Sequence, residues 1–214
     1  MTEQMEKYLE LLIAANERMN LTAVRAPDEI RIRHFEDSLR LFDAYEFPHG
    51  ASLIDVGTGA GFPGLTLKLA RPDLRVTLLD ATGKKVEFLR EVCEKLELDG
   101  VTCLHGRAEE LAHTALRESF DIVTARGVTA MPALCEICLP LVRVGGVMLA
   151  MKELPEPCEC AGLFGGRALE PYVYTLTGGI RHAVVRVQKE RPAPGHFPRT
   201  WAQIKRAGEA KLRG

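Results

Sequence analysis

The sequence predicts an α/β protein with a doubly wound, mostly parallel β-sheet of seven strands and a helical cap at its N-terminus. Short apolar runs of strand length alternate with stretches of helical spacing, and this alternation is typical of parallel sheets. The first apolar run, 53–56, leads into a glycine-rich turn, as expected of a buried strand followed by a helix. Gly178 and Gly179 separate the last two alternating runs, which predicts a closing hairpin.

The N-terminal region is expected to be helical. Apolar residues recur at helical spacing through 3–19, and a second helical stretch begins after Pro27 and reaches Phe42. The tripeptide Pro-His-Gly at 48–50 then breaks the chain. We expect one α/β domain that carries a cap and a basic tail, not two separable domains. The expected cap, domain and tail occupy residues 1–48, 49–190 and 191–214.

Strands and helices are expected to alternate through the domain. The five strands that helices separate are expected at 53–56, 76–80, 101–104, 121–124 and 147–151. The hairpin strands are expected at 172–177 and 182–188. Helices are expected at 65–69, 84–98 and 134–141.

The composition excludes several classes of protein. Hydrophobic residues make up 46% of the 214 residues and the formal net charge is −1, so neither a disordered chain nor a basic coat protein fits. The longest apolar stretch is too short to span a bilayer, and the acidic N-terminus has no apolar signal core. We therefore expect a cytoplasmic protein without membrane contact. The oligomeric state stays open, with a monomer as the working expectation.

Positive charge gathers at the C-terminal end. Residues 181–214 hold nine Lys or Arg and two Asp or Glu. Such an excess on an acidic body favours a polyanionic partner. A solvated, poorly ordered tail would have the same composition, so both interpretations stay open.

The six cysteines are expected to be reduced thiols. Cys135-x-x-Cys138 and Cys158-x-Cys160 could imitate a four-thiolate zinc site. Cys135 and Cys138 lie in an apolar helical run, however, where small thiols pack like alanine. We therefore expect no metal site.

The turn after the first strand is the first candidate ligand site. Gly57, Gly59 and Gly61 allow the backbone to approach a ligand closely. The spacing matches the dinucleotide fingerprint, and Asp80 follows where a ribose-binding acid is expected. The pattern fits either a nicotinamide cofactor or S-adenosylmethionine. Asp55 favours the second, because a carboxylate there could hold an ammonium group but would repel a pyrophosphate.

Further candidates follow the later strands. Asp80 is expected to accept hydrogen bonds from both ribose hydroxyls, or else to cap the next helix. Ala108 and Glu109 are expected to contact adenine, although acids in a first helical turn also stabilise the helix. Arg126 ends the fourth strand, where it could hold a phosphate, stack on a base or form a salt bridge. Phe62 is expected either against the ligand or in the core.

Several separate motifs occur together in this chain. They are Arg33-His34-x-x-Asp37-Ser38-Leu39, Asp55 to Gly64, Leu78-Leu79-Asp80, Arg107-Ala108-Glu109, the Arg126 segment, Lys152 and Phe197-Pro198-Arg199. Together they resemble the bacterial ribosomal RNA small subunit methyltransferase G family, also called glucose-inhibited division protein B, over about residues 16–199. The end of the chain, 201–214, departs from the family's usual proline- and lysine-rich finish.

That resemblance implies a Rossmann-like class I methyltransferase. The implied reaction transfers a methyl group from S-adenosylmethionine to N7 of guanine 527 in 16S ribosomal RNA of the small ribosomal subunit. The resemblance assigns cofactor contacts to Gly57, Phe62, Ala108, Glu109 and Arg126. We also expect Arg126 to be the catalytic residue, because it ends the strand nearest the methyl group.

RNA contact is expected of Arg33, His34, Lys152 and Arg199, although His34 could instead pack at the helical cap. Guanine N7 already has a free lone pair, so the reaction needs placement and electrostatics rather than a general base. The alternatives are a methyltransferase for another RNA or a small molecule, a nicotinamide-dependent oxidoreductase, and a ribosome-binding protein whose enzyme site is vestigial.

Overall fold

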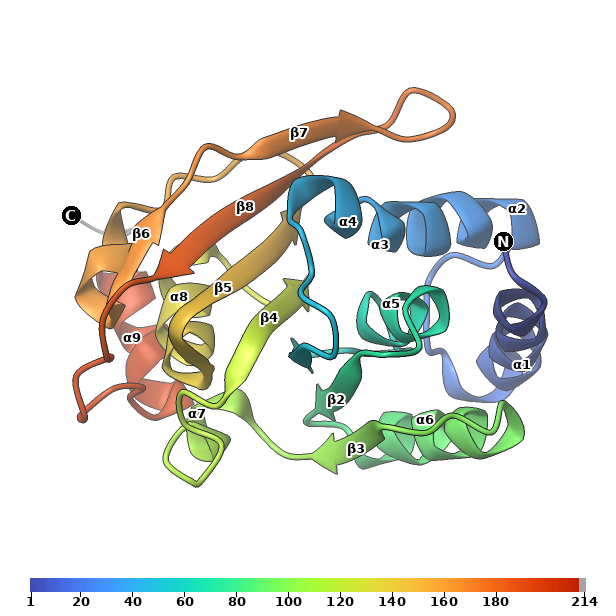
Figure 1. Ribbon diagram of the computed structural model, residues 1–214, viewed down its shortest axis with the longest axis horizontal. Helices are drawn as coiled ribbons and strands as arrows, with labels where there is room; N and C mark the ends of the chain where they lie inside the picture. Colours follow the sequence, from blue (N-terminus) through green and yellow to red (C-terminus); the bar gives the residue numbers. More distant parts are fainter. Residues whose placement is uncertain (212–214) are drawn as a thin grey trace.

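The computed structural model describes residues 1–211 as one twisted sheet with helices on both faces (Figure 1). The strands are β1 Ser52–Val56, β2 Arg75–Asp80, β3 Val101–His105, β4 Phe120–Arg126, β5 Val142–Lys152, β6 Gly166–Ala168, β7 Tyr172–Thr175 and β8 Arg181–Lys189. The helices are α1 Glu3–Met19, α2 Pro27–Ile30, α3 Asp37–Leu39, α4 Leu41–Ala44, α5 Gly64–Ala70, α6 Gly83–Lys95, α7 Ala108–Leu111, α8 Met131–Cys138 and α9 Trp201–Lys211. A π-helical segment, Arg31–Glu36, joins α2 to α3, and 3₁₀ segments occupy Leu139–Leu141 and Glu159–Phe164.

The doubly wound sheet predicted from the sequence is confirmed. The strand order is β3-β2-β1-β4-β5-β8-β6, and β7 also pairs with β8. Strands β1 to β5 run parallel, and β8 runs antiparallel to β5. The chain therefore winds outward from β1 to β3 and then returns to the other side of β1. This reversal creates a topological switch point between β1 and β4.

The described part of the chain has one strand more than the seven predicted. Strand β8 pairs with β5 along one edge and with both β6 and β7 along the other. Strand β6 pairs with 187–189 of β8, and β7 pairs with 181–184. The two short strands therefore share the seventh position of the sheet. Strand β6 has three residues, too few for an alternating pattern to reveal it.

Neighbouring residues of the central strands face two separate cores. Leu53 and Ile122 contact the core on the side of α1, α5 and α6, whereas Ile54 and Val123 contact the core on the side of α7 and α8. All four side chains are fully buried. A strand buried on both faces needs apolar residues at consecutive positions, which explains the continuous apolar runs in the sequence.

The N-terminal cap shares its core with the sheet. Thr2 begins α1, because its side chain accepts a hydrogen bond from the Met5 amide. Tyr8 on α1 is fully buried, and its hydroxyl donates to the carbonyl of Ala60 in the glycine turn. The cap therefore supports the turn that follows β1. The cap boundary at residue 48 stays a prediction.

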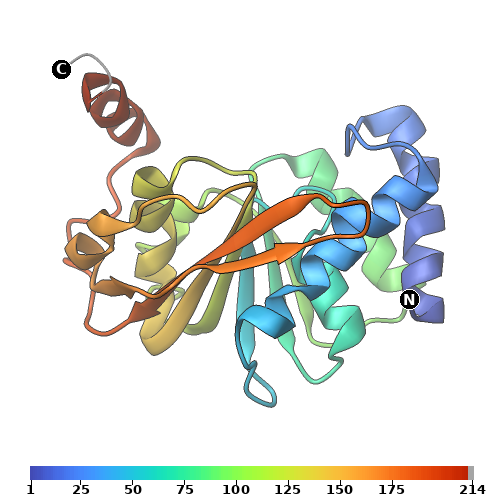
Figure 2. The same ribbon diagram turned by 90° about the horizontal axis from the view of Figure 1, so that it is seen from above.

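The described part of the C-terminal segment ends in helix α9. Helix α9 lies at the opposite end of the molecule from α1 in both Figure 1 and Figure 2. Ile204 of α9 is buried against the core beneath α8. Ile204 thus packs the first turn of the basic helix against the domain, and the poorly ordered alternative for the tail stays open. The predicted tail ends at 214, and its last three residues lie outside the described range.

No helix in residues 1–211 is both long enough and apolar enough to cross a membrane.

Candidate active site

Two adjoining cavities open at the carboxyl ends of the parallel strands. The large cavity, of about 750 Å³, is lined by residues that follow β4 and β5 and by residues of the π-helical segment. The small cavity, of about 120 Å³, is lined by residues that follow β1, β2 and β3. Val128 lines both, so the cavities meet at the switch point between β1 and β4.

Four predicted cofactor residues line the small cavity, namely Gly57, Asp80, Ala108 and Glu109. The side chains of Asp80 and Glu109 are each 8% exposed. The nearest cation to Glu109 is Arg107, at 3.8 Å between nitrogen and oxygen. Two carboxylates with spare acceptor capacity suit a ligand that brings hydroxyl and amine donors.

Asp80 also organises the turn after β1. One carboxylate oxygen accepts from the Gly59 amide at 2.9 Å, and the other accepts from the Thr82 amide at 2.8 Å. Thr82 directly precedes α6, so Asp80 orders the backbone at this helix start. A carboxylate has about four acceptor sites, so each oxygen retains capacity for a ribose hydroxyl. Asp80 is not the cap of α6, because Thr82 occupies the N-cap position. Its contact with ribose hydroxyls stays a prediction.

The glycines of the turn serve different purposes. Gly57 has a φ of +68°, and a Cβ there would lie 2.7 Å from Val128 Cγ2 beside the small cavity. Gly61 has a φ of +106°, and a Cβ there would lie 2.5 Å from the Tyr8 hydroxyl. Gly59 lies in open space and donates its amide to Asp80. Gly57 is thus the glycine that lines the cavity, whereas Gly61 makes room for the cap.

Asp55 does not lie where the sequence argument placed it. Its side chain is fully buried, and it lines neither cavity. One oxygen accepts from the Thr58 hydroxyl at 2.6 Å and the Gly64 amide at 2.9 Å, and the other accepts from the Thr124 hydroxyl at 2.8 Å. Burial raises the pKa of this carboxyl to about 6, against the opposing effect of these hydrogen bonds. The predicted direct contact between Asp55 and a ligand is therefore wrong. Asp55 instead joins the turn to β4 and α5.

Phe62 belongs to an aromatic cluster rather than to a cavity wall. It is 3% exposed, and its ring stacks on Tyr8 with centroids 5.3 Å apart. Phe35 meets it edge-on at 5.2 Å, and the His34 ring lies at 4.8 Å. The Arg126 guanidinium lies 5.4 Å from the ring centroid. Phe62 therefore lies in the core, the second of its two predicted positions. Its ring packs against His34 and Arg126, which line the large cavity.

The predicted catalytic and RNA-binding residues Arg33, His34, Arg126 and Lys152 line the large cavity together. The Lys152 ammonium donates to the Thr129 carbonyl at 2.8 Å and pairs with Glu156 at 3.0 Å. The site therefore gathers side chains from the π-helical segment and from the ends of β4 and β5. Hydrogen bonds to other groups of the protein hold three of these four side chains, those of Arg126, His34 and Lys152.

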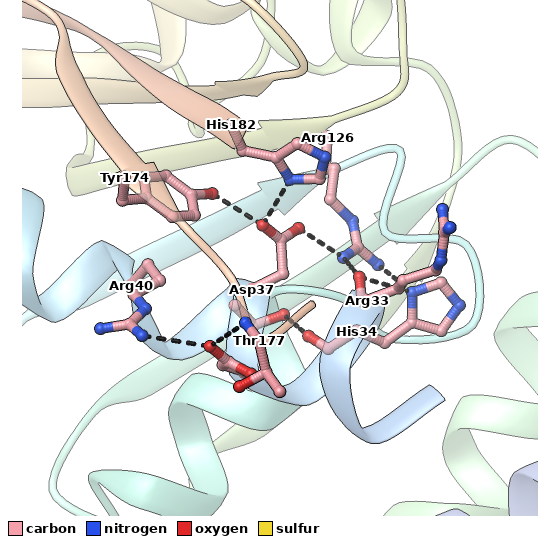
Figure 3. Close-up of polar contacts among 10 residues, drawn as sticks. Arg33, His34, Asp37, Arg40, Arg126, Tyr174, Thr177 and His182 are labelled. Atoms are coloured by element: carbon pink, nitrogen blue, oxygen red, sulfur yellow. Dashed lines mark hydrogen bonds and ion pairs between the residues drawn. The ribbon is translucent and has the colours of Figure 1, made fainter. Parts of the chain in front are cut away.

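A buried carboxylate, Asp37, holds the large cavity together (Figure 3). Its side chain is 2% exposed. One oxygen accepts from the Tyr174 hydroxyl at 2.7 Å and lies 2.8 Å from His182 Nδ1. The other accepts from Arg126 at 3.1 Å, and the same guanidinium donates to the Arg33 carbonyl at 3.0 Å. This network fixes Arg126 against the helical cap.

Asp37, Tyr174 and His182 were missed as site residues by the sequence reasoning. Asp37 stands within the quoted Arg33 to Leu39 motif, and that motif was the one signal available. Tyr174 and His182 belong to the closing hairpin, and their distance in sequence from Asp37 hides the contact. Burial and the Asp37 carboxylate together raise the pKa of Tyr174 above its ordinary value, so its hydroxyl stays a donor.

His34 is neutral at physiological pH. Burial, reinforced by the Arg126 charge, lowers its pKa from 6.5 to about 4. Its Nε2 lies 2.8 Å from the Thr22 hydroxyl, and its Nδ1 lies 3.3 Å from an Arg126 nitrogen. The imidazole therefore contributes a polar edge to the large cavity without adding positive charge.

Arg199 lies away from both cavities. Its guanidinium makes a bidentate pair with Glu136 of α8, at 2.8 Å and 2.7 Å, and its amide donates to the same carboxylate. The Glu136 side chain is 3% exposed. An RNA contact by Arg199 stays a prediction, and its contacts within the protein hold the start of α9 against α8.

The four cysteines of the zinc-like pattern do not gather at one point. The Cys135 and Cys158 sulfurs lie 3.2 Å apart and Cys160 interacts with both, whereas Cys138 is a separate, fully buried thiol. Burial raises the Cys138 pKa above its ordinary value. Among residues 1–211 no group of three or more His, Cys, Asp or Glu side chains has the arrangement of a metal site.

The sheet topology defines the class of this protein as a Rossmann-like α/β fold. A solved structure of an MtNAS variant in complex with S-adenosylmethionine matches with a TM-score of 0.60 and 20% identity, over 88% of this chain and 72% of that one. A SAM dependent methyltransferase from Aquifex aeolicus matches with a TM-score of 0.54 and 17% identity, over 78% and 96%. At these identities the likeness concerns the fold.

The family follows from the sequence comparisons. The family model GidB, rRNA small subunit methyltransferase G, matches residues 1–161. The protein of that name from Moorella thermoacetica is 45% identical over 203 residues, 91% of this chain and 84% of its own length. The protein from Deinococcus radiodurans is 44% identical over 206 residues, 92% and 81% of the two chains. The chain belongs to the rRNA small subunit methyltransferase G family, as its motifs predicted.

Proposed function

We propose that this protein uses S-adenosylmethionine to methylate N7 of a guanine in 16S ribosomal RNA. The observation that carries the proposal is the meeting of two unlike cavities at the switch point. The small cavity offers acidic acceptors. The large cavity offers Arg33, Arg126 and Lys152, of which Arg126 pairs with Asp37 and Lys152 with Glu156. The first suits a nucleoside with donor groups, and the second suits a nucleotide of a polyanion. Family membership supports the same reaction.

The residues of the small cavity fit the nucleoside part of the cofactor. Asp80 would accept hydrogen bonds from the ribose hydroxyls, and Glu109 would accept one from the adenine amine. The absence of a Cβ at Gly57 leaves room for the ligand beside these carboxylates. Bound there, S-adenosylmethionine supplies a methyl group on a positively charged sulfur. Asp55 contributes by holding the turn, because it is fully buried, lines neither cavity and bonds to the protein through both oxygens.

The large cavity would receive the guanine. Arg126 is restrained by Asp37 and by the Arg33 carbonyl, so its guanidinium is oriented before RNA arrives. Neutral His34 would line the guanine site without taking a proton, because its ring nitrogens face the Thr22 hydroxyl and the Arg126 guanidinium. Guanine N7 attacks with its own lone pair, so no protein group needs to remove a proton. Placement in line with the methyl group supplies the catalysis.

The partner surface is proposed to surround the large cavity. Exposed Arg33 and Lys152, whose side chain is 12% exposed, line the large cavity, and α9 carries exposed Lys205 and Arg206. Contacts of this kind with phosphate give affinity without sequence information. Whether free 16S RNA or an assembled small subunit presents the guanine is decided by comparing the two as substrates.

The test is transfer of labelled methyl groups to small-subunit RNA from cells that lack this protein, with mass mapping of the methylated guanine. We expect one N7-methylguanine, and Arg126→Ala should lower its rate of formation at saturating RNA. Arg143→Ala is the matched control, because Arg143 is the second residue of β5 and lines neither cavity. Absence of methyl transfer, or transfer to a small molecule instead of RNA, would contradict the proposal.

A further inference from the structure

Trp201, the single tryptophan of the chain, lines the small cavity. It is the first residue of α9, and it lines the cavity together with Asp80, Ala108 and Glu109. The side chain is half-buried and packs against the core beneath α8. A segment that composition describes as a basic tail therefore contributes an aromatic wall to the candidate cofactor site.

Three separate contacts of neighbouring residues hold the start of α9, where Trp201 lies. Arg199, two residues earlier, forms its bidentate pair with buried Glu136. The Gln203 side-chain oxygen accepts from the Thr200 amide at 3.1 Å and from the Thr200 hydroxyl at 3.0 Å. Ile204, 4% exposed, anchors the first turn of α9. An aromatic ring at the start of a helix fixed in this way is oriented before a ligand arrives.

The other walls of the small cavity suit a flat, weakly polar ring. Val56, Leu79 and Ile137 provide apolar surface, and Glu109 provides an acceptor beside them. A purine with an exocyclic amine satisfies both properties, because its faces are apolar and its amine needs an acceptor. Ile137 follows Glu136 on α8, so the residue that anchors Arg199 stands next to a wall of the cavity.

We propose that Trp201 forms one wall of the adenine subsite and stacks on the adenine ring of S-adenosylmethionine. This inference rests on the proposed function, because it takes S-adenosylmethionine as the ligand of the small cavity. It assigns a cofactor-binding role to α9, in the part of the chain that departs from the family's usual finish. The basic helix thereby also becomes part of the cofactor site.

The test uses the emission of Trp201 itself, which is free of interference from any other tryptophan. Calorimetry first measures the affinity of the full-length protein for S-adenosylmethionine. Saturating S-adenosylmethionine should then quench or shift the Trp201 emission, with a midpoint equal to the calorimetric dissociation constant. Adenosine should produce the same change, whereas methionine should produce none. Calorimetric binding with unchanged emission would overturn the role of Trp201.

Variants give a second, independent measurement. Trp201→Ala should weaken S-adenosylmethionine binding by about 5-fold to 100-fold, the range found when aromatic stacking on a base is removed. Trp201→Phe should restore most of the affinity, because a phenyl ring also stacks. Leu116→Ala is the control, since Leu116 packs against the same core and does not line the small cavity.

The outcomes separate this inference from the proposed function. If the wild-type protein binds no S-adenosylmethionine, the cofactor assignment fails. If it binds, but Trp201→Ala lowers only the unfolding temperature and leaves the affinity unchanged, Trp201 is a packing residue. If Trp201→Ala does not fold, Trp201→Phe and the emission of the wild-type protein still decide the question.

Discussion

Replacement of Asp55 by asparagine distinguishes a ligand-binding carboxylate from one that holds the glycine turn. In the structure the Asp55 oxygens bind Thr58, Gly64 and Thr124, and no part of the side chain reaches a cavity. An amide can keep all three contacts, because its oxygen accepts from Thr58 and Gly64 while its nitrogen donates to the Thr124 hydroxyl. Asp55→Asn should therefore fold and should retain S-adenosylmethionine binding to within a few-fold.

The stability of this variant should differ from the wild type in a defined pH range. Burial raises the folded-state pKa of Asp55 from 3.8 to about 6, so the folded protein holds this proton more tightly than the unfolded chain. Above pH 6 the wild type therefore carries a penalty of about 3 kcal/mol, from 1.36 kcal/mol for each pKa unit. That penalty shrinks as the pH falls through 6 and vanishes below 3.8. Asp55→Asn removes the titrating group and hence the penalty.

Urea unfolding of both proteins between pH 4 and pH 7.5 measures this effect. The difference in unfolding free energy should favour Asp55→Asn by its largest amount at pH 7 and should decline toward pH 4, because the other titrating groups cancel in the difference. A difference that does not change with pH would refute the buried, titrating carboxylate. A loss of tenfold or more in S-adenosylmethionine affinity, with folding intact, would instead support direct contact between Asp55 and the ligand.

Three further predictions concern the two cavities. Asp80→Ala should lower S-adenosylmethionine affinity at least tenfold by calorimetry, because charge-assisted hydrogen bonds are each worth about 1.5–3 kcal/mol; unchanged affinity with lower stability would leave Asp80 only its role in the turn. Asp37→Asn should lower the unfolding free energy by about 2–4 kcal/mol in a urea titration, since Arg126 loses a buried partner, and an effect under 1 kcal/mol would argue against the network. The His34 imidazole should titrate near pH 4 by NMR, and its contribution to stability should be lost as the pH falls from 6.5 toward 4, because the unfolded chain takes up the proton first; titration near 6.5 would contradict its burial.

The order of strands and helices could be predicted because each depends on a local pattern. Residues 53–56 form a continuous apolar run since β1 is buried on both faces, and the glycines that follow require positive φ whatever surrounds them. Asp80 could be placed at the small cavity for the same reason, because parallel strands bring their carboxyl ends to one edge of the sheet. Strand β6 was not predicted, because three residues are too few to show an alternating pattern of polar and apolar side chains.

The orientation of side chains at the site was decided by the tertiary structure. Asp55 and Asp80 both stand at the ends of parallel strands, yet one faces the core and the other faces a cavity. Tyr174 reaches Asp37 across 137 positions of sequence. Trp201 reaches the small cavity because α9 folds back onto α8. The sequence by itself determined the fold, the turn and the family, since these follow from local patterns and motifs. Only the packing of distant segments decided which carboxylate is buried, which aromatic ring lines a cavity and what restrains Arg126, because such contacts join residues that no local pattern relates.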